Sequence, residues 1–193
     1  MKHRKDEVSP QSLARGKVLV GLGANCPGPW GKPTKTLRRA LRELERAGVT
    51  VLAVSDLYET AAMGQPRQPP YVNAVALAAM SLPAPSLLRL LKQVEARAGR
   101  RGGRPWGMRT LDLDILDYKG LIMNGAKARR GPPRRRRHAL ILPHPQLDQR
   151  AFVLRPLLDV APNWRHPVLK VSARELWQRV SKRGQGRVLK RLS

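Results

Sequence analysis

The stretch Leu111-Asp-Leu-Asp-Ile-Leu116 alternates apolar residues with two aspartates, and it opens a segment, residues 111–118, that is typical of a strand. The side chains of a strand point alternately to opposite faces, so the apolar residues would face a core. Asp112 and Asp114 would leave together from the other face, with Cα atoms about 7 Å apart. The stretch therefore predicts a sheet that is buried on one side and acidic on the other.

Hydrophobic patterning before and after this stretch predicts the remaining elements. Glycine and proline breaks separate them, and apolar residues at helical spacing identify the helices. Strands are expected at 17–22, 49–58 and 71–81, helices at 34–47 (capped by Thr34) and 87–98 (capped by Ser86), and a short helix around 150–160. The order strand, helix, strand, strand, helix, strand predicts an α+β fold, an α/β sandwich with a ferredoxin-like β-α-β-β-α-β core and a mainly antiparallel sheet.

Positive charge dominates the composition and is concentrated in three segments. The chain of 193 residues has 38 Lys and Arg against 13 Asp and Glu, a formal net charge of +25. We expect a flexible basic extension at 1–16, a basic insert at 125–138 and a basic tail at 179–193, all as mobile surface decoration of one domain at 17–178. Such charge attracts polyanions, so a role of these segments in nucleic-acid binding stays open.

Several classes of protein are excluded by the sequence. A single cysteine, Cys26, excludes an internal disulfide framework and favours a reducing compartment. The longest purely apolar run, residues 74–80, is far shorter than the roughly 18 residues that span a bilayer. The basic N-terminus has no apolar stretch behind it, so no signal peptide is expected and the protein is predicted to be cytoplasmic.

Two glycine patterns begin like phosphate-binding motifs but fail in detail. Gly21-Leu-Gly23 starts like a dinucleotide fingerprint, yet Cys26 stands where the third glycine belongs. Gly31-Lys32 looks like the end of a P-loop, yet Pro33 replaces the Ser or Thr that would bind magnesium. Any phosphate chemistry must therefore use other residues.

Arginines lie close to the acidic pair in the sequence. Arg109 precedes Asp112 by three residues, and Arg100 begins a glycine-containing loop that also carries Trp106. Two adjacent carboxylates repel each other, so a divalent cation is their natural partner, and all-oxygen ligands suit magnesium. Metal ions and arginines together can neutralise the phosphates of a nucleoside triphosphate. A simpler interpretation is a half-exposed strand with acids on its wet side.

The same region resembles a known family. Trp106-Gly-Met-Arg-Thr-Leu-Asp-Leu-Asp-Ile-Leu116 is similar to the signature of 6-hydroxymethyl-7,8-dihydropterin pyrophosphokinase, also called 2-amino-4-hydroxy-6-hydroxymethyldihydropteridine diphosphokinase. Further blocks follow in family order, and the resemblance covers about 17–165; the blocks are residues 20–25, 58–64, 68–73, 143–145 and 150–157. The departures from the family pattern are Met108 in place of proline, Lys92 in place of glutamine, and Ala139 and Ile141 in place of arginine and threonine.

The resemblance implies an ATP-dependent diphosphokinase. Pyrophosphate would pass from ATP to 6-hydroxymethyl-7,8-dihydropterin with release of AMP, a step of folate biosynthesis. Asp112 and Asp114 would hold two Mg²⁺ ions, ATP would be the co-substrate, and Arg100 and Arg109 would stabilise the transfer. The implied ATP site comprises Glu95, Arg100, Trp106, Arg109, Ile115, His144 and Arg150. The implied pterin site comprises Thr60, Ala61, Met63, Tyr71, Asn73, Trp106 and Phe152.

Two other functions stay open beside this one. The net charge would also suit a basic nucleic-acid-binding module on a ferredoxin-like sheet, although aromatic residues make up only 4% and leave few platforms for stacked bases. A folate-pathway scaffold with a decayed site is disfavoured, because Asp112, Asp114 and Arg109 are all present. As an enzyme, the chain is expected to act as a monomer on ATP and the pterin, with no membrane and no requirement for nucleic acid.

Overall fold

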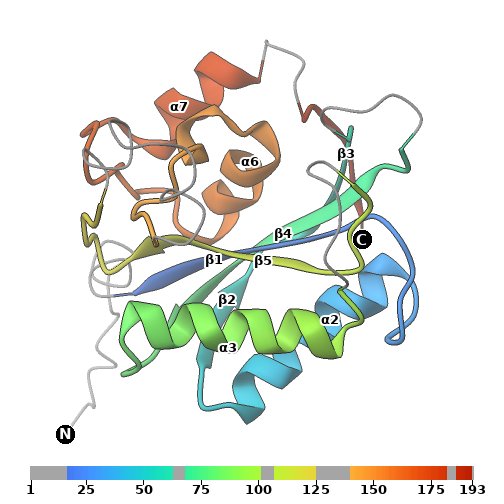
Figure 1. The fold of residues 1–193 in the computed structure, drawn as a ribbon. Helices are drawn as coiled ribbons and strands as arrows, with labels where there is room; N and C mark the ends of the chain where they lie inside the picture. Colours follow the sequence, from blue (N-terminus) through green and yellow to red (C-terminus); the bar gives the residue numbers. More distant parts are fainter. Residues whose placement is uncertain (1–16, 63–67, 101–106, 125–139, 182–185, 193) are drawn as a thin grey trace, which may run out of the picture.

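A six-stranded antiparallel sheet lies between two layers of helices (Figure 1). The computed structural model describes residues 17–62, 68–100, 107–124, 140–181 and 186–192. Within these residues the strands follow the order β5-β1-β4-β3-β6, and β2 pairs with the other end of β4. The strands are β1 (Val18–Ala24), β2 (Thr50–Val54), β3 (Leu57–Thr60), β4 (Tyr71–Ala79), β5 (Asp112–Tyr118) and β6 (Val188–Leu192).

Helices cover both faces of the sheet. On one face pack α2 (Pro33–Arg46) and α3 (Ala84–Arg97), and on the other pack α6 (Ala151–Val160) and α7 (Ala173–Val180), with the short 3-10 helix η1 (Leu147–Gln149) just before α6 (Figure 1). The order β1, α2, β2 with β3, β4, α3, β5 confirms the predicted ferredoxin-like core. None of the described helices combines the length and the apolar character that crossing a membrane requires.

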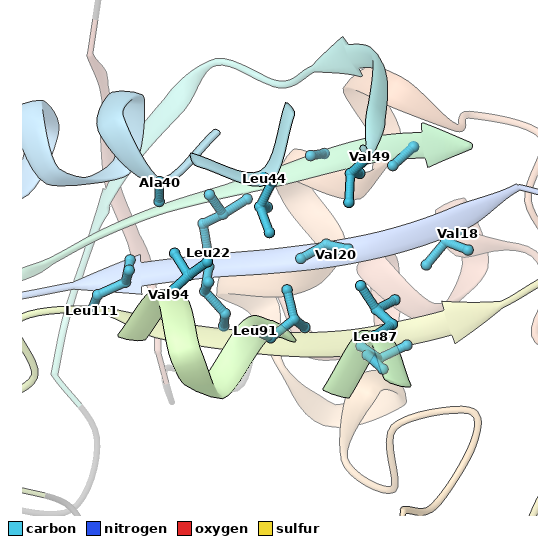
Figure 2. Packing of buried hydrophobic residues seen from close by; sticks show 14 of the residues in the cluster. Val18, Val20, Leu22, Ala40, Leu44, Val49, Leu87, Leu91, Val94 and Leu111 are labelled. Carbon is cyan, nitrogen blue, oxygen red and sulfur yellow. The ribbon is translucent and has the colours of Figure 1, made fainter. Parts of the chain in front are cut away.

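Alternation along β1 divides the core into two clusters. Val20 and Leu22 face α2 and α3, where they meet Leu44 (Figure 2). Leu19 faces the opposite way and joins Leu154 of α6. Each of these five side chains belongs to a residue no more than 3% exposed, so both faces of the central strand are buried here.

The predicted strand at 49–58 is in fact two strands, β2 and β3. The break lies at Ser55, whose buried Oγ accepts a hydrogen bond from the backbone N of Val75 (2.9 Å) and donates one to the carbonyl of Asp56 (2.7 Å). A side chain therefore takes over part of the backbone pairing at this point. The segment 49–58 is rich in β-branched residues on both sides of Leu52 and Ala53, so its composition favours one strand and does not reveal the break.

Helices α2 and α3 begin earlier than predicted. Their N-caps are Lys32 and Pro83 rather than Thr34 and Ser86, and a proline occupies the first turn of each helix. Proline suits this position because the first amides of a helix have no acceptor within it and the φ angle of proline is already helical. The predicted hydroxyl caps were wrong at both helices.

The basic tail is part of the sheet where the structure describes it. Residues 188–192 form β6, which pairs with β3 so that Val188 lies opposite Thr60. The backbone N of Ala61 also donates to the carbonyl of Arg187 at 2.9 Å. The prediction of a mobile tail at 179–193 was therefore wrong for these residues, because strand pairing outweighs their charge. The segments 1–16 and 125–138 lie outside the described residues.

Removing residues 186–193 should destabilise the fold. The deletion breaks the backbone pairing along β3, where each hydrogen bond is worth roughly 1 kcal/mol, so we expect a loss on the order of 2–4 kcal/mol in the free energy of unfolding. Thermal or urea denaturation measures this loss.

A matched control for this deletion keeps the strand and removes its charge. The double variant Lys190→Thr, Arg191→Thr removes the ion pairs of these residues with Glu59 and Asp56. Because both basic side chains are exposed, the free energy of unfolding should fall by less than about 1 kcal/mol. Equal stability of the shortened and complete chains would show that β6 does not hold β3.

Asp117, near the end of β5, is a buried carboxylate. The residue is 5% exposed, and its Oδ2 accepts a hydrogen bond from Nε1 of Trp164 at 3.0 Å. Burial raises the pKa of Asp117, and the hydrogen bond from Trp164 opposes that rise only in part. The charged form of Asp117 is therefore less favourable in the folded chain than in the unfolded chain.

Asp117→Asn should remove this pH dependence. As the pH falls from 7 toward 4, the folded protein takes up a proton at Asp117 before the unfolded chain does, so the wild type gains stability relative to the variant. The measurement is the Tm of both proteins across this range. A Tm difference that stays constant with pH would contradict the expectation.

Candidate active site

A cavity of about 370 Å³ lies on the sheet face that carries the two aspartates. Strands β1, β3, β4 and β5 form one side of it, and α6 with the residues just before it contributes the other. The cavity brings together the predicted residues Thr60, Ala61, Tyr71, Asn73, Arg109, Asp112, Asp114, Arg150 and Phe152. It is also lined by Gly21, Leu22, Gly23, Ala74, Leu116, Gln146 and Val153, which were not predicted as site residues.

The two glycines of β1 form a part of the cavity wall that has no side chains. A Cβ atom at Gly23 would lie 2.8 Å from Oδ1 of Asn73, and one at Gly21 would lie 3.2 Å from Cδ2 of Leu116. A larger residue at Gly23 would therefore displace Asn73 from the cavity. Because Gly21-Leu-Gly23 lies inside a strand and not at a strand-to-helix turn, the exclusion of a dinucleotide fingerprint is confirmed.

Strand β5 places Asp112 and Asp114 on the cavity face, with side chains 34% and 36% exposed. Leu113 between them is fully buried on the opposite face, as the alternation predicts. Each carboxylate also has a cationic neighbour. Nη1 of Arg100 lies 2.6 Å from Oδ1 of Asp112, and Nη1 of Arg150 lies 3.8 Å from Oδ2 of Asp114.

Glu95 of α3 is a buried carboxylate that bonds to the backbone of β5 between the two aspartates and to Arg100. Its Oε1 accepts hydrogen bonds from the backbone N of Leu113 and from Nζ of Lys92, each at 2.7 Å. Its Oε2 lies 2.5 Å from Nη1 of Arg100, so this guanidinium bridges Glu95 and Asp112. Burial acts to lower the pKa of Arg100, but Asp112 and Glu95 outweigh it and the pKa is raised.

His144 stands next to Asp114, in surroundings that favour the neutral form of its imidazole. Burial lowers its pKa, and the nearby Asp114 carboxylate opposes that shift only in part. Its Nδ1 accepts a hydrogen bond from the backbone N of Gln146 (3.2 Å), so the ring proton sits on Nε2, which lies 3.9 Å from Oδ2 of Asp114.

Polar and aromatic residues occupy the other part of the cavity. Nδ2 of Asn73 donates to Oγ1 of Thr60 at 2.7 Å, and both residues are buried. The hydroxyl of Tyr71 donates to the carbonyl of Gly107 at 3.2 Å. The ring of Phe152 lies under the guanidinium of Arg150, 5.5 Å from its central carbon.

Some predicted site residues lie outside the cavity wall. Glu95, Arg100 and His144 do not line the cavity. They lie next to it: Arg100 pairs with Asp112 and with Glu95, and His144 lies near Asp114. The side chain of Ile115 is buried in the α2–α3 cluster on the other face of the sheet, so it points away from the cavity. Met63 and Trp106 lie outside the described residues.

Comparison with known proteins shows to which family the chain belongs. Residues 19–162 match the family described as 7,8-dihydro-6-hydroxymethylpterin-pyrophosphokinase (HPPK). Two relatives named 2-amino-4-hydroxy-6-hydroxymethyldihydropteridine pyrophosphokinase are similar along most of the chain. The protein from Synechocystis sp. is 37% identical over 151 residues, which cover 78% of this chain and 69% of the relative. The protein from Pseudomonas aeruginosa is 38% identical over 152 residues, which cover 78% and 84%.

A solved structure shows the same fold at low sequence identity. The crystal structure of wild-type Plasmodium falciparum HPPK-DHPS with SDX-DHP superposes with a TM-score of 0.59 at 14% identity. The superposition covers 86% of this chain and 44% of that longer one. From the family match and the close relatives, the chain belongs to the 7,8-dihydro-6-hydroxymethylpterin-pyrophosphokinase family, the pyrophosphoryl transferases of folate biosynthesis.

Proposed function

We propose that this chain transfers pyrophosphate inside the cavity of β1, β4 and β5, with ATP on the arginine side and the pterin on the Asn73 side. The observation that carries the proposal is that Asp112, Asp114, Arg109, Asn73 and Phe152 all line one cavity.

The reaction is a substitution at phosphorus. The hydroxymethyl oxygen of the pterin attacks the β-phosphorus of ATP, and the bond from that phosphorus to the oxygen bridging to the α-phosphate breaks. AMP leaves with the bridging oxygen, and the hydroxyl proton passes to solvent. Such transfers depend mainly on positioning and on neutralisation of phosphate charge, so a strong protein base is not required.

Cationic side chains would hold the triphosphate. Arg109 and Arg150 line the cavity, and Arg100 stays protonated because its pKa is raised. Arg100 is paired with Asp112, so phosphate oxygens would replace that carboxylate as its partner when ATP binds. Neutral His144 would add a hydrogen-bond donor at Nε2 without adding charge.

The acidic pair fits magnesium. Asp112 and Asp114 offer partly exposed carboxylate oxygens on one cavity face, and magnesium usually needs only one or two protein carboxylates. Within the described parts of the chain, no group of three or more His, Cys, Asp or Glu residues is placed to hold a metal ion, so water and phosphate oxygens would have to complete the ligand shell. Asp112 and Asp114 would hold two Mg²⁺ ions, which would neutralise phosphate charge during the transfer.

The pterin would bind where aromatic and amide groups meet. The side-chain amide of Asn73 can donate and accept, as recognition of the polar edge of a pterin requires, and its bond to Thr60 fixes its orientation. Tyr71 and Phe152 both line the cavity and offer flat apolar faces for the ring. Ala61 would add contacts at the end of β3.

The direct test is AMP formation. With ATP and Mg²⁺, the protein should release AMP only when 6-hydroxymethyl-7,8-dihydropterin is supplied, which chromatography of the nucleotides measures. A chain that releases no AMP but shifts RNA in a gel, in a manner that weakens with salt, would favour the nucleic-acid-binding alternative.

Asp112→Asn and Asp114→Asn should each lower kcat by about two to three orders of magnitude, because each removes the charge that would hold the metal while keeping the shape of the side chain. Asp117→Asn is the matched control on the same strand, since Asp117 does not line the cavity. Turnover close to wild type in either site variant would contradict the metal assignment.

A further inference from the structure

Asn25 follows the last residue of β1 and is 3% exposed, but it is not part of the cavity wall. Its backbone N donates to the carbonyl of Arg109 at 2.9 Å. Its side-chain Oδ1 accepts from the backbone N of Arg109 at 2.7 Å. These two bonds close a ring, so Asn25 pairs with both backbone hydrogen-bonding groups of Arg109, the N–H and the C=O, as a residue of a neighbouring strand would.

The same side chain reaches a second segment. Nδ2 of Asn25 donates to Oε1 of Gln68 at 3.2 Å and to the carbonyl of Pro69 at 3.4 Å. Residues 68–70 lead directly into β4, which begins at Tyr71. One buried amide therefore links two segments that are about 40 residues apart in the sequence.

Each linked segment leads to a different part of the cavity. Arg109 lines the phosphate side and lies just before Asp112. Residues 68–70 lie just before Tyr71 and Asn73 on the pterin side. Asn25 therefore connects the segments that lead into these two parts of the cavity.

We propose that Asn25 is a positioning residue that holds the ATP side and the pterin side of the cavity at a fixed separation, an inference that rests on the proposed function. The transfer needs the attacking oxygen and the β-phosphorus close together and in line, and small misplacements of that kind cost rate steeply. Asn25 acts through Arg109 and through the 68–70 segment, and contacts neither substrate.

Asparagine suits this position because its two branches have opposite hydrogen-bonding character. The oxygen branch accepts from the backbone N of Arg109, and the nitrogen branch donates to the side-chain Oε1 of Gln68 and to the backbone carbonyl of Pro69. Aspartate keeps the first bond and loses the donors for the second pair. Alanine loses both.

Two variants therefore separate the two halves of the site. In Asn25→Ala, we expect the KM values for ATP and for the pterin each to rise about tenfold, with a further fall in kcat. In Asn25→Asp, we expect the KM for the pterin to rise similarly while the KM for ATP stays within about twofold of wild type, because the bond to Arg109 remains. Steady-state kinetics of AMP release measures both.

Ser55→Ala is the matched control. Ser55 is also a small buried polar residue that accepts a backbone N–H, and it does not line the cavity. A variant that only destabilises the fold lowers the amount of active enzyme and leaves both KM values unchanged. We expect this result for Ser55→Ala. KM values in Asn25→Ala that match the control, or a KM for ATP that rises equally in both Asn25 variants, would overturn the proposal.

Amide exchange gives a readout that does not depend on activity. Hydrogen exchange at the amide of Arg109 should become faster in Asn25→Ala and stay near wild type in Asn25→Asp and Ser55→Ala. Unchanged exchange in Asn25→Ala would overturn the positioning role even if the wild type releases no AMP. A wild type that releases no AMP would contradict the proposed function instead.

Discussion

The buried carboxylate of Glu95 is the group on which the position of β5, at the cavity edge of the sheet, depends. A charge whose side chain is only 3% exposed is stable in a protein only when it is paired and hydrogen-bonded. Glu95 meets this requirement with the backbone N of Leu113, with Lys92 and with Arg100. Its partners come from α3, from β5 and from the residue Arg100 just after α3, so these parts are held in one arrangement. Leu113 lies between the two cavity aspartates, and anchoring its amide fixes the strand from which both carboxylates project.

The fold and the acidic pair could be predicted from the sequence because both follow from local periodicity. Alternation along β5 leaves only one arrangement in which Leu113 is buried, and that arrangement places Asp112 and Asp114 on the opposite face. The same alternation predicts a core position for Ile115, whereas the family resemblance implies a nucleotide contact for it. The structure places its side chain in the core, as the alternation requires.

Features that depend on distant partners could not be predicted. The break at Ser55 exists because its hydroxyl meets the amide of Val75, and nothing in residues 49–58 shows this. The residues of β6 have the composition of a charged tail, and they form a strand only because β3 pairs with them in the fold. Helix α7 was missed although its start carries a local signal, the capping box in which Ser172 and Glu175 bond to each other's backbone N–H groups. This Ser-x-x-Glu pattern is by itself typical of a helix start.

The glycines of β1 have a consequence for inhibition. A compound that rests against the bare backbone at Gly21 and Gly23 would contact atoms that no substitution can remove. A side chain introduced at Gly23 would collide with Asn73, so a change that expels the compound would also disturb the amide proposed to recognise the substrate. A substitution at Gly23 that confers resistance would therefore also lower the activity of the enzyme. The β1 backbone is for this reason a favourable contact surface for an antifolate.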